Sequence, residues 1–275
     1  MDGDRSTEHT VTVLGDVTLD GQRLTPAQGA LVSALVLHHP TPTTTEALID
    51  LVWDDTAPDT ARQSVQNQIF RLRQRFGTEV VATNPSGYRL RAVSDASAFE
   101  AALPGSDGTT QTASTPDRLE AALALWRGLP YRRLNHPAAD GERARLLDLH
   151  GSASERLAAE RIAEGRFDRA IVELTALCRS HPFREHLWGL LMVALTEVGR
   201  RVEALATFNR LTRLLDAELD TRPSARLRRL RSAIDRDEPL GLIEFVDHVG
   251  PNRGRGPSWT TRPLAVNHRV AVPTG

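Results

Sequence analysis

A pattern that recurs after 34 residues constrains the fold of this chain more than any other feature of its sequence. Residues 165–170 (GRFDRA) return as residues 199–204 (GRRVEA), with the glycine, one arginine and the alanine in the same places. A glycine that ends one helix and a small alanine where helices cross are typical of antiparallel helix pairs. The same offset relates further apolar positions: Leu157 to Leu191, Leu174 to Phe208, and Leu177 to Leu211. The second half of the chain is therefore expected to be a stack of helices.

This period is that of the tetratricopeptide pattern, in which each helix pair needs a neighbour to bury its apolar face. Two clear copies fall short of the usual three, so flanking helices are expected to complete the stack. Residues 104–116 (PGSDGTTQTASTP) are rich in turn formers, and we expect a mobile loop there. The expected helices cover residues 95–103, 117–126, 142–164, 167–180, 184–198, 201–217 and 223–235.

The types of basic and thiol residues exclude several chemistries. All 34 basic residues are arginine, so there is no P-loop, Schiff-base or kinase-type lysine. The single cysteine, Cys178, excludes an internal disulfide and Cys-rich zinc sites, and we expect it in the core. His38 and His39 point about 100° apart on a helix, and His181 and His186 do not share a helix face. We therefore predict a protein that is not an enzyme and has no cofactor or metal.

The net charge of −1 conceals an uneven distribution. Residues 1–61 carry two arginines and ten acids, residues 62–91 carry six arginines and one acid, and residues 92–238 carry 22 of each. A compact basic stretch in an acidic or neutral chain is the electrostatic footprint of nucleic-acid binding, although a solvated helix face explains the same count. A second basic group, at residues 226, 228, 229 and 231, fits a solvated face or an auxiliary contact with DNA or an acidic partner.

Residues 10–91 have the element order of a winged helix-turn-helix. Strands are expected at 10–14 and 17–19, before the hairpin turn Asp20-Gly21. Two further strands, at 79–82 and 88–91, would form a wing around residues 83–87. Between them the sequence predicts three helices with their end signals: 27–37 after Thr25-Pro26, 44–53 with a capping box from Thr43 to Glu46, and 59–76 before Gly77.

The third of these helices has one apolar side and one polar side. At 100° per residue, the apolar residues Ala61, Val65, Ile69, Leu72 and Phe76 fall within about 80° and would pack inward. The opposite face carries amides and arginines, the side chains that read adenine and guanine edges. Phe70 on that face would contact a thymine methyl group or be buried under the wing. The outward residues are Gln63, Gln66, Asn67, Phe70 and Gln74, flanked by Arg62, Arg71 and Arg73.

Two sets of motifs resemble a known family. TARQSVQNQIFRLRQRFG (60–77) followed by VVATNPSGYRL (80–90) resembles the reading helix and wing of OmpR-type winged helices. With VLGDVTLDG (13–21) and ALIDLVWDDTAPDTAR (47–62), it is similar in particular to the Streptomyces antibiotic regulatory protein (SARP) family. LALWRGLP (123–130) and residues 163–195 resemble the bacterial transcriptional activation domain of that family, a tetratricopeptide-like bundle.

The resemblance implies roles for individual residues. The turn after the second helix would contact RNA polymerase through Asp54, Asp55, Thr56 and Asp59. Trp53 in that turn is expected to fill the core. With the outward residues of the third helix, the wing residues Asn84, Ser86, Tyr88 and Arg89 would contact DNA.

One departure from the family concerns the first helix. Family members often carry basic residues there that can grip phosphate, whereas this chain has Ala27 and Gly29. One protomer is therefore expected to bind DNA weakly. If it neutralises about four phosphates, the logarithm of its affinity should fall with the logarithm of salt at a slope near −3.6. Pairing of protomers on DNA would then be important.

The sequence thus predicts a mainly α chain. A winged helix-turn-helix DNA-binding domain (10–92) would precede a tetratricopeptide-like activation domain (93–238), with a flexible N-terminus (1–9) and a disordered tail (239–275) that holds one apolar patch at 240–246. The expected function is sequence-specific transcriptional activation of antibiotic biosynthesis genes by a homodimer on promoter direct repeats, with recruitment of RNA polymerase holoenzyme. The alternative is a tetratricopeptide-like interaction scaffold with weak or vestigial DNA binding. The chain has no membrane-spanning run and no secretion signal, so we expect a cytoplasmic, nucleoid-associated protein.

Overall fold

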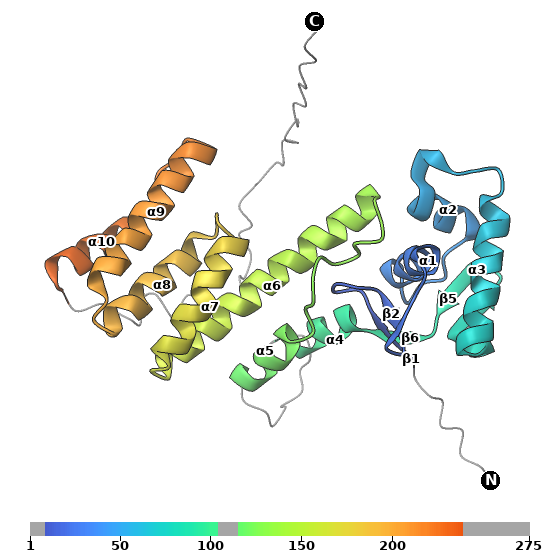
Figure 1. Ribbon diagram of the computed structural model, residues 1–275, viewed down its shortest axis with the longest axis horizontal. Coiled ribbons are helices and arrows are strands. Elements are labelled where there is room, and N and C mark those ends of the chain that lie inside the picture. Colours follow the sequence, from blue (N-terminus) through green and yellow to red (C-terminus); the bar gives the residue numbers. More distant parts are fainter. Residues whose placement is uncertain (1–8, 104–114, 239–275) are drawn as a thin grey trace, which may run out of the picture.

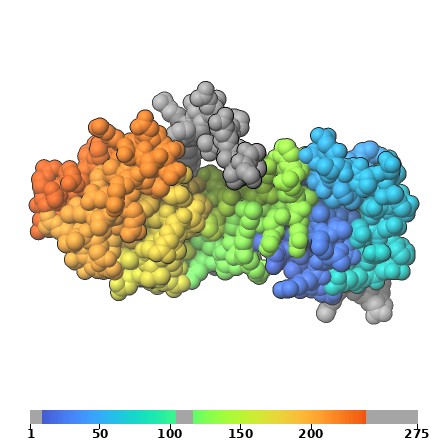
Figure 2. Space-filling view, turned by 45° about the horizontal axis from the view of Figure 1, so that its top comes forward, coloured from blue at the N-terminus to red at the C-terminus, as the bar shows by residue number. Residues whose placement is uncertain are grey.

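The computed structural model describes residues 9–103 and 115–238. Residues 1–8 of the expected flexible N-terminus, the greater part of the expected mobile loop, and the tail with its apolar patch lie outside the described residues, whereas His9 belongs to a strand. The described chain forms an elongated body, with a winged helix at one end and a stack of helices at the other (Figures 1 and 2). The mainly α fold class expected from the sequence is confirmed.

The winged helix combines three helices with two small sheets. One sheet has the strand order β3-β2-β1-β6 and the other pairs β4 with β5. The strands are β1 (His9–Thr12), β2 (Thr18–Leu19), β3 (Gln22–Arg23), β4 (Val81–Asn84), β5 (Gly87–Leu90) and β6 (Ala92–Ser94). The helices are α1 (Pro26–Leu37), α2 (Thr45–Trp53) and α3 (Ala61–Phe76), with 3₁₀ turns η1 (Asp54–Thr56) and η2 (Thr78–Val80).

Local signals account for the start of this domain. Asp20 and Gly21 join β2 to β3 with φ of 48° and 72°, the left-handed pair that a two-residue type I′ hairpin requires. Thr25 and Gln28 form a capping box at the start of α1, and Pro26 is its first residue, as predicted.

The second helix starts one residue later than predicted. The N-cap of α2 is Thr44, whose hydroxyl accepts a hydrogen bond from the backbone of Ala47, so the expected cap at Thr43 was wrong. Thr43 is buried and instead exchanges two backbone hydrogen bonds with Tyr88, at 2.8 and 2.9 Å. The residue before the helix therefore anchors the wing.

The strands at the end of the winged helix also differ from the prediction. β4 begins at Val81 rather than residue 79, because residues 78–80 form η2. Strand β6 was not predicted; it pairs in parallel with β1 and leads into the helical half of the chain. A strand of three residues between a wing and a helix has too little periodicity to be recognised.

The helical module, residues 95–238, contains all seven expected helices. They are α4 (Asp95–Ala102), α5 (Thr115–Leu123), α6 (Pro137–Ala163), α7 (Phe167–Ser180), α8 (Glu185–Glu197), α9 (Arg201–Leu219) and α10 (Ala225–Arg236). α6 starts five residues before the expected position, because His136 caps it and Pro137 occupies its first turn.

The 34-residue repeat is present in three dimensions. Gly165 and Gly199 have φ of 72° and 76°, the left-handed conformation that commonly ends a helix. The next residue in each copy donates its backbone N–H to a carbonyl of the preceding helix at 2.8 Å, from Arg166 to Arg161 and from Arg200 to Leu195. The alanines that follow, at 170 and 204, are fully buried where helices meet.

Buried apolar side chains form two cores that meet inside α6. The first extends from Val11 in β1 to Leu157, and the second extends from Ala158 to Ile234 in α10. Trp53 packs against the first core, and Cys178 is buried in the second, as expected. The division of the chain into domains at residues 92 and 93 stays a prediction. Among the described residues, no helix combines the length and apolar character that crossing a membrane requires.

Candidate nucleic-acid interface

Helix α3 lies at the outer edge of the winged helix, with one face free (Figure 1). Its inner residues Ala61, Val65, Ile69 and Leu72 are buried, and Phe76 is half-buried. Phe70 is 61% exposed, which excludes the alternative of a ring buried under the wing. The other outward residues, Gln63, Gln66, Asn67 and Gln74, are exposed as well.

Two of these outward side-chain amides are hydrogen-bonded to each other. Nε2 of Gln63 donates to Oδ1 of Asn67 at 3.1 Å, one helical turn away. This bond fixes the orientation of both amides and leaves the Asn67 amino group and the Gln63 carbonyl free. A free donor beside a free acceptor is the pattern that matches the N7 and N6 groups of adenine.

The six arginines of residues 62–91 divide into three groups. Arg62 forms a surface ion pair with Glu46 of α2, and Arg91 pairs with Glu79 at 2.7 Å. Arg73 and Arg75 are used inside the domain, as described next. Arg71 and Arg89 have no hydrogen-bond or ion-pair partner in the described part of the chain.

Arg73 supports the wing. Its guanidinium donates to the carbonyl of Val81 at 2.7 and 3.0 Å and to the hydroxyl of Thr83 at 2.7 Å. Arg75 similarly donates to Gln22 and to the carbonyl of Arg23. These bonds show that Arg73 joins α3 to β4, and its predicted contact with DNA stays a prediction.

The wing is a tight hairpin with an anchored base. Asn84 pairs with Gly87 across a two-residue turn of Pro85 and Ser86, which are both exposed. Gly87 has φ of 125°, and a Cβ there would lie 2.1 Å from the carbonyl oxygen of Thr43, so only glycine fits. Asn84, Tyr88 and Arg89 are half-buried. The tip is thus held at a fixed distance from α3.

The turn between α2 and α3 presents acids to solvent. Asp54, Asp55, Thr56 and Asp59 are all exposed. Asp54 has φ of 51° and ψ of −142°, a conformation that strains a residue with a side chain. Glu46 at the start of α2 adds another carboxylate, whose pKa is lowered by its own backbone amide and then by Arg62. These carboxylates form an acidic rim beside the basic face of α3.

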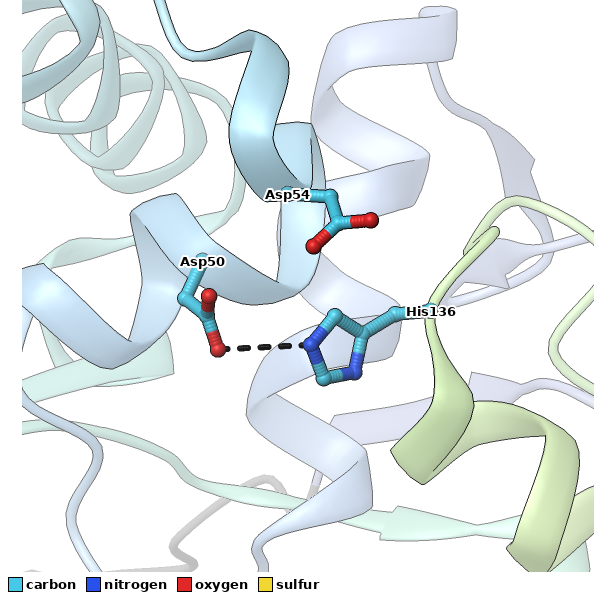
Figure 3. Close-up of side chains that lie close together, drawn as sticks. All are labelled: Asp50, Asp54 and His136. Carbon is cyan, nitrogen blue, oxygen red and sulfur yellow. Dashed lines mark ion pairs between the residues drawn. The ribbon is translucent and has the colours of Figure 1, made fainter.

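Asp50, Asp54 and His136 bring three potential metal ligands within 4.8 Å of one another (Figure 3). Nδ1 of His136 accepts the backbone N–H of Ala138 at 3.2 Å, so a neutral ring carries its proton on Nε2. Nε2 lies 3.3 Å from Oδ2 of Asp50. A metal-bound histidine normally donates from its second nitrogen, which a facing backbone N–H prevents. The arrangement therefore favours a hydrogen bond between α2 and the start of α6 over a metal site.

Of the two positions that lack the family's basic residues, Ala27 is exposed and Gly29 is covered by the helical module. Gly29 is buried, and a Cβ there would lie 3.5 Å from Cγ of Arg133. Arg133 belongs to the segment between α5 and α6, on the opposite side of α1 from α3 (Figure 1). Because Gly29 is covered, its lack of a basic side chain says little about contact with DNA, and in this helix the expectation of weak DNA binding then rests on the exposed Ala27.

The two residues that follow β1, Val13 and Leu14, are bonded to the helical module at several points. The carboxylate of buried Asp95 accepts the backbone N–H of Val13 at 2.7 Å and that of Leu14 at 3.3 Å. Burial raises the pKa of Asp95, and these two bonds oppose the rise. The backbone of Tyr131 donates to Val13 at 2.9 Å, and the backbone of Arg127 donates to Leu14 at 2.8 Å. The winged helix that contains α3 is thus bonded to the helical half of the chain.

Comparison with known proteins decides the family. Residues 94–235 match the bacterial transcriptional activator domain, and residues 20–90 match the C-terminal domain of transcriptional regulatory proteins. DnrI of Streptomyces peucetius, a regulatory protein, is 31% identical over 239 residues, which is 80% of this chain and 85% of DnrI. The chain belongs to the SARP family.

Other SARP-type relatives are longer. The regulatory protein AfsR of Streptomyces griseus is 34% identical over 241 residues, which is 83% of this chain but 25% of AfsR. The transcriptional regulatory protein EmbR of Mycobacterium tuberculosis is 32% identical over 244 residues, or 62% of its length. The solved structure of EmbR with a low-affinity phosphopeptide superimposes with a TM-score of 0.72 at 29% identity, covering 87% of this chain and 68% of that one.

The chain thus contains the two matched regions of SARP-family transcriptional regulators, at residues 20–90 and 94–235. Its candidate DNA contacts and its candidate polymerase turn stay predictions. Sequence reasoning missed the residues that hold the interface in place, namely Asp95, Tyr131, Arg133 and His136. Asp95 looked like an ordinary acid in the first turn of a helix, and nothing in the sequence pointed to the other three.

Proposed function

We propose that this SARP member is a sequence-specific transcriptional activator that reads promoter DNA with the outward face of α3. The observation that carries the proposal is the composition of that face. Its exposed side chains between Arg62 and Gln74 are amides, arginines and one phenylalanine, without a carboxylate. Elsewhere, across residues 92–238, arginines and acids are equal in number. A face kept free of acids is suited to a polyanion.

In this proposal α3 enters a major groove and the wing follows the adjacent backbone. Asn67 and Gln63, already oriented by their mutual bond, would contact one adenine. Arg71 and Arg89 are free to meet phosphates or guanine, and Arg62 would exchange its exposed pair with Glu46 for a phosphate. Phe70 would contact a thymine methyl group. The proposed surface is completed by Gln66, Arg73, Gln74, Asn84, Ser86 and Tyr88.

Activation would come from the acidic turn beside α3. Asp54, Asp55, Thr56 and Asp59 are exposed and would contact RNA polymerase holoenzyme while α3 holds DNA. Two protomers would bind direct repeats about one helical turn apart, the spacing at which two readers face the same way. Secondary-metabolite genes are the proposed targets, and the cytoplasm, at the nucleoid, is the proposed place of action.

A gel-shift titration across promoters beside the protein's own gene tests the reading face. Asn67→Ala should weaken binding to a protected site by about 1–3 kcal/mol and relax base preference at one position. Asn209→Ala, at an exposed position of α9, is the matched control and should leave binding unchanged. An unaltered base preference in Asn67→Ala would contradict the assignment of this face.

The polymerase turn is tested separately by in vitro transcription. Replacing Asp54, Asp55 and Asp59 together by Asn should abolish activation and leave the DNA affinity no lower than in the wild type. The alternative function, a helical scaffold with vestigial DNA binding, has one observation in its favour: four of the six arginines in residues 62–91 already have protein partners. Finding no protected promoter at low salt and micromolar protein would support the scaffold.

A further inference from the structure

A cavity of about 390 Å³ lies in the helical module between α5, α6 and α7. This volume falls in the range of small-molecule sites in proteins. Much of its lining is apolar, with Leu123 of α5, Leu157 of α6 and Leu177 of α7 around it. Leu157 belongs to the first core and Leu177 packs against the second, so the cavity lies where the two cores meet.

The charged groups around the cavity neutralise one another. Arg161 is 3% exposed and pairs with Glu120 at 3.0 Å and with Glu173. Arg169 pairs with the same two carboxylates, at 3.3 Å for Glu173. Two positive and two negative side chains thus form a closed quartet that joins α5, α6 and α7. A charged ligand would find no free counter-ion here and would have to break one of these pairs.

Beside this quartet the lining includes one uncharged aromatic ring, that of His150. His150 lines the cavity, and its ring centroid lies 4.3 Å from that of Trp126. Burial, and then the nearby charges of His181 and Arg184, lower the pKa of His150 to about 4, so the ring is uncharged at neutral pH. Nδ1 of His150 and Nε1 of Trp126 are buried with no hydrogen-bond partner within the described residues. Polar atoms left unpaired in this way are uncommon in a finished core.

We propose that this cavity is a binding site for a small, uncharged, mainly apolar molecule of aromatic character. Three observations define the ligand class: a leucine lining, an ionic quartet without spare charge, and a neutral histidine ring in the lining that is in tilted contact with Trp126 behind it. The proposal concerns the helical module alone and does not depend on the DNA-reading face. Because the cavity adjoins both cores, a bound molecule would contact the half that carries the winged helix and the half that carries α8–α10.

The test uses two fluorescent dyes that have the same aromatic ring system but differ in charge. N-phenyl-1-naphthylamine is uncharged, and 8-anilinonaphthalene-1-sulfonate has the same ring system with an anionic group. Each dye is titrated into the full chain, and its fluorescence is followed. We expect the uncharged dye to bind with one saturable site, and the sulfonate to bind at least about tenfold more weakly, which corresponds to ~1.4 kcal/mol.

Variants at exposed alanines locate the site without disturbing the core. Ala176 lines the cavity from α7, and Ala124 lines it just after α5, whereas Ala206 on α9 is exposed and outside it. Ala176→Phe should fill the space and Ala124→Glu should add a charge, each weakening the uncharged dye by about tenfold. Ala206→Phe should bind it as the wild type does. Thermal unfolding of all three variants shows whether they are folded.

The possible results separate clearly. The site is supported if the uncharged dye binds saturably, if Ala176→Phe and Ala124→Glu weaken this binding, and if the control Ala206→Phe does not. Absence of saturable binding, or equal binding to folded Ala176→Phe and to the wild type, would overturn it. Tighter binding of the sulfonate would overturn the ligand class, since it would show that Arg161 or Arg169 is available to an anion.

Discussion

Two of the six arginines around α3 lack a carboxylate or hydrogen-bond partner within the described residues, whereas several arginines of the helical module are each held by two carboxylates. In the helical module, Arg145 bonds with Glu100 and Glu142, and Arg184 bonds with Asp148 and Glu155. Around α3, Arg71 has no partner within the described ranges, and it stands on a face without acids. Because one residue type serves both purposes in this chain, the presence or absence of nearby carboxylates decides whether an arginine builds the fold or is available to a ligand.

A third use lies between these two. Arg73 belongs to α3, yet its guanidinium donates to the carbonyl of Val81 and the hydroxyl of Thr83. A count of arginines along the sequence cannot distinguish Arg73 from Arg71. The difference between the two side chains lies in the carbonyl that the wing places within reach, which the sequence does not reveal.

The largest expected effect concerns the buried ion pairs of the helical module. Replacing Arg161 by Met leaves Glu120 and Glu173 with Arg169 alone. Breaking a buried pair from one side costs roughly 3–5 kcal/mol, and partial exposure of the two carboxylates reduces this, so we expect about 3 kcal/mol less stability. Urea unfolding of the full chain measures the loss.

The matched control is an exposed pair from the same module. Arg200 bonds with Glu203 at the surface, at 2.7 Å, and Arg200→Met should leave the urea midpoint unchanged, because exposed pairs are weakened by solvent and salt. Equal destabilisation by both variants would contradict the distinction between buried and exposed arginine pairs. The distinction would also be contradicted if neither variant were less stable than the wild type.

A smaller effect should appear as a pH dependence of the helical module. The pKa of His150 is about 4 in the folded chain and about 6.5 in an unfolded one. Its stabilising contribution is therefore complete above pH 6.5 and is lost as the pH falls from 6.5 towards 4. Between pH 7.5 and pH 5, linkage gives a loss of about 2 kcal/mol. His181, whose pKa burial also lowers, acts in the same direction.

Urea unfolding at the two pH values, with the wild type and His150→Phe, checks this contribution. The variant should lose less stability on acidification than the wild type. An identical loss in both proteins would show that other groups cause it. The DNA-reading residues 61–91 contain no histidine, so the comparison between the two regions predicts that acidification to pH 6 leaves the salt slope of DNA binding unchanged.

Local signals in the sequence were enough to predict the elements but not how they are joined. Asp20-Gly21, Thr25-Pro26 and Gly165 act through their own backbone or their near neighbours, so the turns and helix ends that they mark could be predicted. The exposed face of α3 could also be derived, because helical geometry alone decides which residues face the same way. The role of Thr43 could not be predicted, because it depends on backbone hydrogen bonds with Tyr88, which lies 45 residues further along the chain.

The same limit explains the residues that were missed at the junction. Asp95 is bonded to Val13 and Leu14, which lie more than 80 residues earlier. Arg133 lies over Gly29, a contact that only the folded chain creates. Composition and periodicity describe one element at a time, so they contain no information on which arginine or carboxylate a distant element will bring close.

The third effect should be local to the wing. Arg73→Ala removes the bonds to Val81 and Thr83 and should loosen β4 and β5 by about 1–2 kcal/mol, since hydrogen bonds from charged donors contribute roughly 1.5–3 kcal/mol and these are partly exposed. Hydrogen exchange of the amides of residues 81–90 measures it. Gln74→Ala, at the exposed neighbouring position, is the control and should leave exchange unchanged. Unaltered hydrogen exchange in Arg73→Ala would show that Arg73, like Arg71, does not stabilise the wing.

The smallest effect is the most direct test of the comparison. Arg71→Ala should leave the stability unchanged and reduce the salt slope of DNA binding by about 0.9, the contribution of one phosphate contact. Arg229→Ala is matched to it, because Arg229 is also exposed and without a partner in the described structure, but it lies on α10 of the helical module. We expect no change of slope there. If both variants reduced the salt slope of DNA binding, α10 would also contact DNA. Arginines without a carboxylate partner would then mark a DNA interface on both halves of the molecule.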